Sequence, residues 1–327
     1  MYETAYHTND LSNLSFLITG GAGFIGSNLV EYLLKYNAKK VRVLDNFSNG
    51  YRENLTAFEN HPAFELIEGD IRDLETCKSA MDGIDYVSHQ AALGSVPRSI
   101  NDPATTDAVN ITGFLNMMIA LKDSKTVKRM VYAASSSTYG DSKNLPKVEP
   151  IIGNPLSPYA VTKYVNELYA DVFAKTYQTD AIGLRYFNVF GPKQSPKGAY
   201  AAVIPLFMEA LMNDQAATIN GDGEQTRDFT FVENAVQANV KGFFAPKNAG
   251  NEVYNIACGE RISVNFLWQS LSKAAHKSIP PLYGPPRQGD VRDSLADISK
   301  ANKLMGYQPR FNVDQGLDIT WNYFKNK

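Results

Sequence analysis

The chain has 327 residues, of which 44% are hydrophobic and 20% charged, and its formal net charge is −2. These values are ordinary for a globular protein with an ample core, and they give no sign of a surface for nucleic acid or for an anionic membrane. The two cysteines, Cys77 and Cys258, form neither a disulfide framework nor a metal-ligand spacing. We therefore expect no metal site and a reducing, cytoplasmic location.

Residues 1–14 are polar and mixed, and they lack the basic start and apolar run of a signal peptide. No stretch has the roughly 20 apolar residues of a membrane span. We expect this N-terminal extension to include a short helix and to pack on a nucleotide-binding part of the protein.

A short apolar run at residues 16–18 is followed by Gly20, Gly23 and Gly26, and then by residues 27–34 with helical apolar spacing. In a dinucleotide-binding loop, the first glycine allows the sharp turn, the second lets a pyrophosphate approach, and the third lets the helix pack on the strand. The helix N-terminus then offers N–H groups to the phosphates. Alone, the motif leaves open a glycine-rich turn without a ligand.

Asp45 ends a second predicted strand, residues 41–44, about 20 residues after the glycines. A carboxylate at this point accepts hydrogen bonds from the adenosine ribose and repels a 2′-phosphate. Asp45 therefore favours NAD over NADP, although a solvated strand end is the simpler alternative.

Further strands at residues 64–67, 85–92 and 128–134 alternate with helices at residues 73–81 and 103–122. This alternation predicts an α/β fold, a Rossmann-type doubly wound parallel sheet with helices on both faces. Ligands of such sheets lie beyond the carboxyl ends of the strands, which puts Asp70 and Gln90 on the cofactor side. Asp70 could reach the adenine amino group, or it could simply cap a helix.

The fifth strand leads into Ser135, and a helix predicted at residues 157–178 carries Tyr159 and Lys163 four residues apart on one face. An ammonium beside a phenol favours the phenolate, so we expect Lys163 to lower the pKa of Tyr159. Together the three groups can take a proton from a sugar hydroxyl while hydride leaves its carbon for NAD. A pair of surface neighbours is the alternative for the tyrosine and lysine.

With these motifs, the chain resembles the extended short-chain dehydrogenases/reductases over residues 16–325. It is most similar to the UDP-hexose 4-epimerases, in particular the bacterial UDP-N-acetylglucosamine 4-epimerases. The resemblance implies a tightly held NAD, transient oxidation at sugar carbon 4, rotation of the 4-keto sugar and return of hydride to its other face. It assigns Ser135 as the catalytic serine, Tyr159 as the base and Lys163 as its partner, while Ser136 or Ser137 could share the serine's work.

The resemblance also implies two binding sites and a division of the chain. The cofactor site would comprise Gly20, Gly23, Phe24, Ile25, Gly26, Asp45, Asn46, Ser48, Gly50, Asp70, Ile71, Gln90, Ala91, Tyr159 and Lys163. The UDP-sugar site would comprise Ser95, Ser135, Ser136, Ser137, Tyr159, Asn188, Val203, Thr218, Asn220, Arg227, Arg287, Asp290 and Ser294. Residues 1–187 would form the NAD-binding domain, and residues 188–327 mainly a smaller α/β substrate domain that crosses back to the sheet. Helices 103–122 and 157–178 would pair in a homodimer.

Two details bear on the reaction and the sugar. The segment between Ser135 and Tyr139 holds no carboxylate, whereas related dehydratases and decarboxylases carry one there. The resemblance implies that Ser294 occupies the place of the family's gate residue beside sugar carbon 2, where a small serine would leave room for an N-acetyl group. We therefore expect interconversion of UDP-GlcNAc and UDP-GalNAc, with weaker activity on UDP-Glc and UDP-Gal. An epimerase of UDP-hexuronic acids, a nucleotide-sugar dehydratase or reductase, and a non-catalytic NAD-binding protein remain alternatives.

Overall fold

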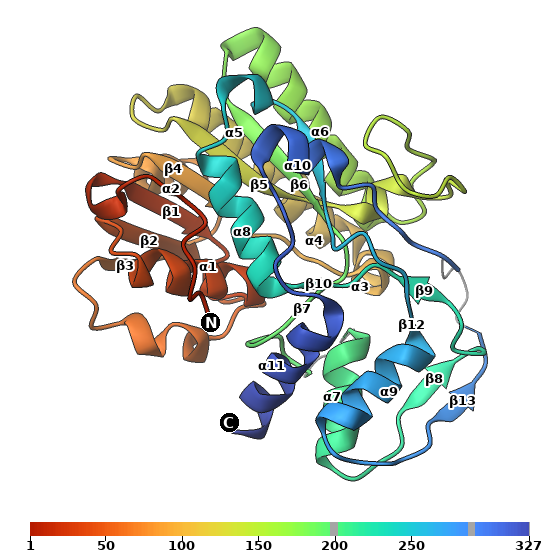
Figure 1. Ribbon diagram of the computed structural model, residues 1–327. Helices are drawn as coiled ribbons and strands as arrows, with labels where there is room; N and C mark the ends of the chain where they lie inside the picture. Colours follow the sequence, from red (N-terminus) through yellow and green to blue (C-terminus); the bar gives the residue numbers. More distant parts are fainter. Residues whose placement is uncertain (197–201, 287–291, 327) are drawn as a thin grey trace.

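The computed structural model describes residues 1–196, 202–286 and 292–326. Its centre is a sheet of seven parallel strands in the order β11-β6-β5-β4-β1-β2-β3 (Figure 1). The strands are β1 (Ser15–Thr19), β2 (Lys40–Asp45), β3 (Phe64–Glu68), β4 (Tyr86–His89), β5 (Arg129–Ser135), β6 (Ala181–Tyr186) and β11 (Val253–Ile256). Helices cover both faces of the central strands, which is why β1 is buried along its whole length.

The strand order reverses between β1 and β4, because β2 and β3 lie on one side of β1 while β4, β5 and β6 lie on the other. This reversal opens a crevice at the carboxyl ends of the strands, where doubly wound sheets bind their ligands. The predicted Rossmann-type fold is confirmed.

One face of the sheet is covered by α1 (Phe24–Lys35) and α8 (Val232–Phe243), with α10 (Ser299–Met305) beside them (Figure 1). Their apolar side chains form one core with Val131 and Leu184 of the sheet. The N-terminal segment packs against the same two helices, as predicted, and its short helix is a 3₁₀ turn, Leu11–Asn13.

The other face is covered by α2 (Leu74–Met81), α5 (Gly113–Asp123) and α6 (Pro158–Tyr177), with α3 (Val96–Asn101) and α4 (Pro103–Asp107) at the carboxyl-end side. The single helix predicted at residues 103–122 is confirmed, since residues 103–123 are helical throughout, and its detail is a π-helical turn, Ala108–Thr112, between α4 and α5. The wide turn carries Asn110, whose buried amide exchanges two hydrogen bonds with the backbone of Leu93 and donates a third to Thr162.

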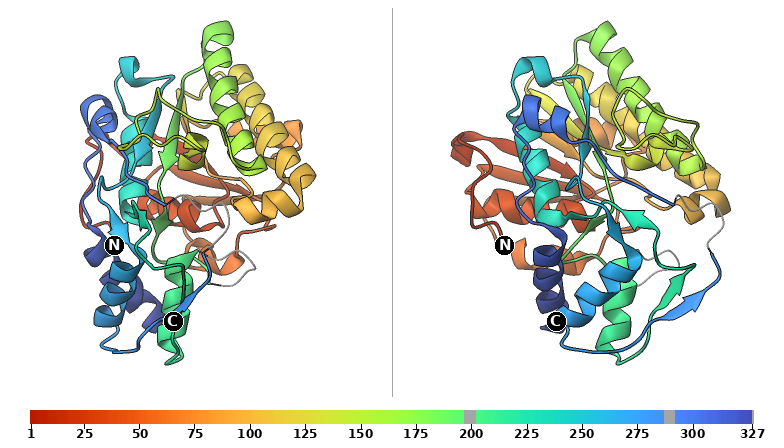
Figure 2. Two further views of the ribbon diagram at one scale, coloured as in Figure 1. Left: turned by 90° about the vertical axis from the view of Figure 1, so that its right-hand side faces the viewer. Right: turned by 45° about the vertical axis from the view of Figure 1, so that its right-hand side comes forward.

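A third layer lies below the sheet in Figure 1 and stands apart from it in both views of Figure 2. It contains α7 (Val203–Met212), α9 (Val264–Ala274) and α11 (Val313–Lys325). Three small sheets complete it: β7 (Val189–Phe190) with β10 (Thr230–Phe231), β9 (Thr226–Arg227) with β12 (Ile262–Ser263), and β8 (Thr218–Asn220) with β13 (Leu282–Gly284). These elements enclose a core of their own around Phe207 and Trp268.

The chain after residue 187 does not stay in this third layer, since α8, β11 and α10 all return to the central sheet. The predicted boundary between residues 1–187 and 188–327 therefore does not separate two groups of elements in space. This division into domains stays a prediction. Among the described helices, none is both long and apolar enough to traverse a lipid bilayer.

Candidate active site

The glycine loop between β1 and α1 has the geometry that a pyrophosphate site requires. Gly20 adopts a φ of +67°, and a Cβ there would lie 2.7 Å from the backbone nitrogen of Ala91. A Cβ on Gly26 would collide with the carbonyl oxygen of Gly20, so this glycine lets α1 start against the strand. No side chain caps the first N–H groups of α1, which begins after Gly23. The loop thus offers close backbone approach and free donors, and it fits NAD.

Asp45 stands at the end of β2 and is buried, which raises the pKa of its carboxyl group. Its two oxygens accept hydrogen bonds from the backbone N–H groups of Ala22, at 2.9 Å, and Phe47, at 2.8 Å. The carboxylate therefore holds the glycine loop in place as well as facing the crevice, a role that its spacing from the glycines did not suggest. Each oxygen keeps a second lone pair for a ribose hydroxyl.

Asp70 follows β3 and forms an ion pair with Arg72, which holds the pKa of Asp70 at about 2. It also accepts a hydrogen bond from Asn46 at 2.9 Å. The helix-capping alternative does not describe it, because Asp73 caps α2.

One pocket at the carboxyl ends of β1 to β4 collects most of the predicted cofactor residues. Its lining includes Gly20, Gly23, Asp45, Asn46, Ser48, Gly50, Asp70, Ile71, Gln90 and Ala91. Phe24, Ile25 and Gly26 lie in the first turn of α1, and Tyr159 and Lys163 lie on α6; none of these five lines the pocket. Sequence reasoning missed its lining residues Leu93 and Val109. In the sequence, only the small residues after β4 indicated that this part of the chain lines the pocket.

The three predicted catalytic groups come from β5 and α6. Ser157 caps α6 and Pro158 follows at its first position, so the sequence starts this helix just before Tyr159. Burial raises the pKa of the Tyr159 phenol, and hydrogen bonding with the Ser135 side chain opposes that rise. The structure thus brings Ser135 and Tyr159 together.

Lys163 reaches from α6 to β5, where its ammonium donates to the carbonyl oxygen of Ala133 at 2.7 Å. Burial lowers the pKa of Lys163 to about 8, and the charge of Glu167 opposes the change. The expected lowering of the Tyr159 pKa by Lys163 is wrong for this arrangement. The phenol is buried, and the ammonium is held by a backbone carbonyl of the strand.

A second pocket begins at Ser135, and neither Tyr159 nor Lys163 is among its lining residues. It is lined by Ser135, Ser136 and Ser137, by Ser294 from the C-terminal part, and by Asn188 and Arg227. The Ser137 hydroxyl oxygen is buried and has no hydrogen-bond partner within the described parts of the chain. An unpartnered buried hydroxyl costs free energy, so it indicates a group that a ligand satisfies.

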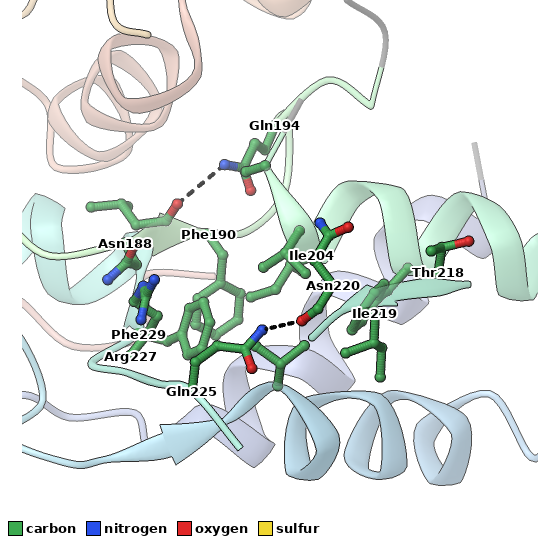
Figure 3. Close-up of a pocket in the computed structure, with 15 residues that line it drawn as sticks. Asn188, Phe190, Gln194, Ile204, Thr218, Ile219, Asn220, Gln225, Arg227 and Phe229 are labelled. Atoms are coloured by element: carbon green, nitrogen blue, oxygen red, sulfur yellow. Dashed lines mark hydrogen bonds between the residues drawn. The ribbon is translucent and has the colours of Figure 1, made fainter. Parts of the chain in front are cut away.

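A third pocket continues from Asn188 and Arg227, which line both spaces. Figure 3 shows these two residues at one end of it, with Thr218 and Asn220 of β8 at the other. Val203, at the start of α7, also lines it. The Asn188 amide donates to the backbone oxygen of Asp228 at 3.0 Å, and Gln225 donates to the backbone oxygen of Asn220 at 2.8 Å. The two pockets together form an elongated space that starts at Ser135 and ends at β8.

Not every predicted substrate residue lies in this space. Tyr159 is among the lining residues of neither pocket. Ser95 lines neither pocket, and it caps α3 by accepting a hydrogen bond from the backbone N–H of Arg98. Arg287 and Asp290 fall outside the described residues.

Sequence reasoning also missed a buried carboxylate that joins the walls of the sugar end. Asp228 is fully buried and accepts hydrogen bonds from the backbone N–H groups of Cys258, Gly259 and Ala296. Burial raises its pKa to about 7. The only sequence signal was its place directly after Arg227.

Comparisons with known proteins agree with this arrangement. Residues 16–257 match the NAD dependent epimerase/dehydratase family. A UDP-glucose 4-epimerase of Mycolicibacterium smegmatis is 35% identical, with 95% of this chain and 98% of the relative covered. The structure of a UDP-N-acetylglucosamine 4-epimerase from Methanobrevibacter ruminantium, in complex with UDP-N-acetylmuramic acid, is 37% identical over 96% of this chain and 99% of that one, with a TM-score of 0.91.

A UDP-glucuronic acid 4-epimerase from Bacillus cereus, solved with UDP-glucuronic acid and NAD, is 32% identical over 96% of this chain and 99% of that one, with a TM-score of 0.87. Relatives with three different sugars thus share this fold almost end to end. The chain belongs to the NAD-dependent epimerase/dehydratase family and groups within it with UDP-sugar 4-epimerases.

Proposed function

We propose that the protein interconverts UDP-GlcNAc and UDP-GalNAc by epimerisation at sugar carbon 4 through a 4-keto sugar, with weaker activity on UDP-Glc and UDP-Gal. Synthesis of a surface polysaccharide is the use we propose for the product. The observation that carries the choice of sugar is Ser294, a small side chain in the wall of the pocket that also contains Ser135. One solved relative with an N-acetylated UDP-sugar in its name supports the same choice.

The proposed chemistry needs one proton acceptor and one hydride acceptor. Tyr159 takes the proton of the 4-hydroxyl group, and Ser135 hydrogen-bonds the same oxygen and orients it. NAD, held by the glycine loop and Asp45, would supply the acceptor for the hydride of carbon 4 and the donor for its return. Lys163 fixes α6 to β5 and supplies positive charge near the nicotinamide end of the crevice. Ser135 and Lys163 are buried, and Tyr159 is half-buried.

The same pocket argues against elimination of water. A dehydratase needs an acid and a base at carbons 5 and 6. The carboxylate among the described lining residues is Asp293, and it is bound to Thr226 at 2.8 Å and to Arg261 at 2.6 Å. It is therefore engaged in structure, and redox cycling at one carbon is the better proposal.

The nucleotide would occupy the elongated space beyond the sugar. Asn188 and Arg227 lie where the two pockets meet, which suits the diphosphate, since a guanidinium donates several hydrogen bonds to phosphate oxygens. Thr218 and Asn220 would then border the uracil.

We further propose that the protein acts as a cytoplasmic homodimer. The outer face of α6 leaves Val161, Leu168 and Val172 each about half exposed, at 46%, 48% and 52%. Their spacing puts them on one side of the helix. Covering such a stripe with a second copy of α6 removes apolar surface from water.

Incubation of the purified protein with UDP-GalNAc, without added cofactor, tests the proposal. Formation of UDP-GlcNAc, with NAD released on denaturation, is the expected result. A 4-keto-6-deoxy sugar would instead identify a dehydratase. Retained NAD without turnover of any UDP-hexose would identify a binding protein.

A further inference from the structure

The sugar end of the pocket contains a cation that the proposed reaction does not use. Its charged lining residues within the described ranges are Arg227, Asp293 and Lys147. Arg227 is assigned to the diphosphate, and Asp293 is paired with Arg261, which does not line the pocket. Lys147 remains, and it comes from the segment between β5 and α6.

The backbone of Lys147 is fixed at the wall that also carries the gate residue. Its N–H donates to the carbonyl oxygen of Leu295 at 2.7 Å, and its carbonyl oxygen accepts from Asp297 at 2.9 Å. The Asn255 amide donates to the same carbonyl oxygen. Lys147 therefore pairs with the strand-like segment that follows Ser294, and its position does not depend on a flexible surface loop.

The Lys147 side chain has little compensation for its charge. The residue is only 5% exposed, and its ammonium donates to the carbonyl oxygen of Ser142. It forms no ion pair with a carboxylate of the described residues, whereas the buried arginines Arg42, Arg129 and Arg185 each have one. The buried Lys163 shares this lack of a carboxylate partner within the described ranges, but it is one of the predicted catalytic groups. Burial lowers its pKa. An ammonium has three N–H donors, so two remain for a ligand.

The space beside it offers a further free donor. Ser137 lines the same pocket, and its buried hydroxyl has no hydrogen-bond partner among the described residues. The ammonium, which holds a single backbone acceptor, and this unpartnered hydroxyl suit a carboxylate ligand, because hydrogen bonds to a charged oxygen are stronger than those to a neutral one.

We propose that Lys147 is a specificity-determining residue that lets the pocket accept UDP-N-acetylhexosamines bearing a carboxylate at carbon 6. This inference rests on the proposed epimerase function. We choose carbon 6 because it lies outside the sugar ring. It can therefore be oxidised to a carboxylate while the ring stays intact. Ser294 leaves room for the N-acetyl group at carbon 2, while Lys147 neutralises the added charge. A reaction that oxidises a 6-hydroxyl to a carboxylate would supply this substrate.

The test compares one sugar in two oxidation states. Initial rates of epimerisation would be measured with the holoenzyme for UDP-GlcNAc and for UDP-N-acetylglucosaminuronic acid. Lys147→Met keeps the length of the side chain without its charge, and Lys147→Arg keeps the charge. The matched control is Lys143→Met, four residues earlier in the same segment and exposed. Bound NAD and the thermal unfolding midpoint report whether each variant is folded.

The wild type should turn over both sugars. Lys147→Met should lower the ratio of kcat/KM for the acid to kcat/KM for the neutral sugar by at least about tenfold, the loss typical of a charged hydrogen bond. Lys147→Arg should stay within about threefold, as should Lys143→Met. An equal loss on both sugars would show that Lys147 only supports the wall, and a wild type that converts the neutral sugar alone would also overturn the inference. Absence of turnover on either sugar would refute the epimerase proposal itself.

Discussion

At the scale of single residues, burial governs the chemistry of the candidate site. Tyr159 needs to lose its proton to act as a base, yet burial raises its pKa and Ser135 is the neighbour that opposes the rise. Lys163 is buried as well, but its charge is held by Ala133 and supported by Glu167. Ser135 is thus the neighbour that opposes the effect of burial on Tyr159, whereas the Lys163 ammonium is held by a carbonyl oxygen of β5.

Replacing Tyr159 by phenylalanine tests the proposed base directly. The variant should keep its NAD, because the glycine loop and Asp45 are unchanged, and it should lose at least about 100-fold in kcat, as expected when a general base is removed. Bound NAD after purification and the rate of UDP-GalNAc conversion are the two measurements. Activity close to that of the wild type would disprove the assignment.

The pKa of Lys163 predicts a pH effect on stability. Its folded-state value of about 8 lies below the ordinary lysine value of about 10.4. The unfolded chain thus binds more protons between these values, so the contribution of Lys163 to the free energy of unfolding rises as the pH increases from 8 to 10. In Lys163→Met this rise, on the order of 2 kcal/mol, should be missing. Urea denaturation of both proteins at pH 7.5, 8.5 and 9.5 measures it, and equal pH slopes would contradict it.

Ser294→Tyr tests the choice of sugar. The larger side chain should fill the space of the N-acetyl group, so kcat/KM for UDP-GalNAc should fall by at least about tenfold relative to that for UDP-Gal. Both rates are measured on the same preparation. Unchanged N-acetyl turnover would remove the argument for the gate.

At the scale of elements, the N-terminal segment holds the cofactor helix in place. The Tyr2 hydroxyl donates to Asn28 of α1 at 2.8 Å, and the Tyr6 hydroxyl donates to Glu233 of α8 at 2.7 Å. Both phenols are buried, and the Tyr6 backbone N–H also bonds the Tyr32 hydroxyl of α1. The segment thereby connects the two helices that cover one face of the sheet.

Tyr6→Phe should therefore lower the free energy of unfolding by about 1.5–3 kcal/mol, the usual range for a hydrogen bond to a charged group. Tyr323→Phe is the control, because the Tyr323 hydroxyl makes no hydrogen bond with the described residues, and it should change stability by less than about 0.5 kcal/mol. Denaturant unfolding of the three proteins gives the comparison. Equal stability of all three would show that the segment merely lies on the helices.

At the scale of the whole molecule, the two cores meet along the elongated pocket. One wall comes from the sheet and α6, and the other from the small sheets and the segment around Ser294. The fully buried Asp228 ties the segment after Arg227 to the segment after Ser294. The site therefore depends on how the two halves of the chain pack against each other.

The proposed dimer gives a prediction at this scale. Leu168→Glu places a carboxylate in the middle of the exposed stripe of α6, and it should weaken association by about 100-fold, since an unpaired charge is costly to bury. Leu206→Glu on α7, where the leucine is 45% exposed, is the matched control. Light scattering over a range of protein concentrations measures the mass. A dimer that persists in Leu168→Glu would place the interface elsewhere.

Local patterns were sufficient to predict the parallel sheet, the glycine loop, Asp45 at the end of β2 and the Tyr159–Lys163 pair on one helix, because each depends on residues within about 20 positions of one another. Tertiary structure alone showed the π-helical turn around Asn110, the return of β11 to the sheet edge, the rise of the Tyr159 pKa and the burial of Lys147 beside the sugar pocket. The physical reason is that hydrophobic periodicity and turn preferences depend on residues that are close together in the sequence. Burial and unpaired charge arise only when distant segments pack against each other.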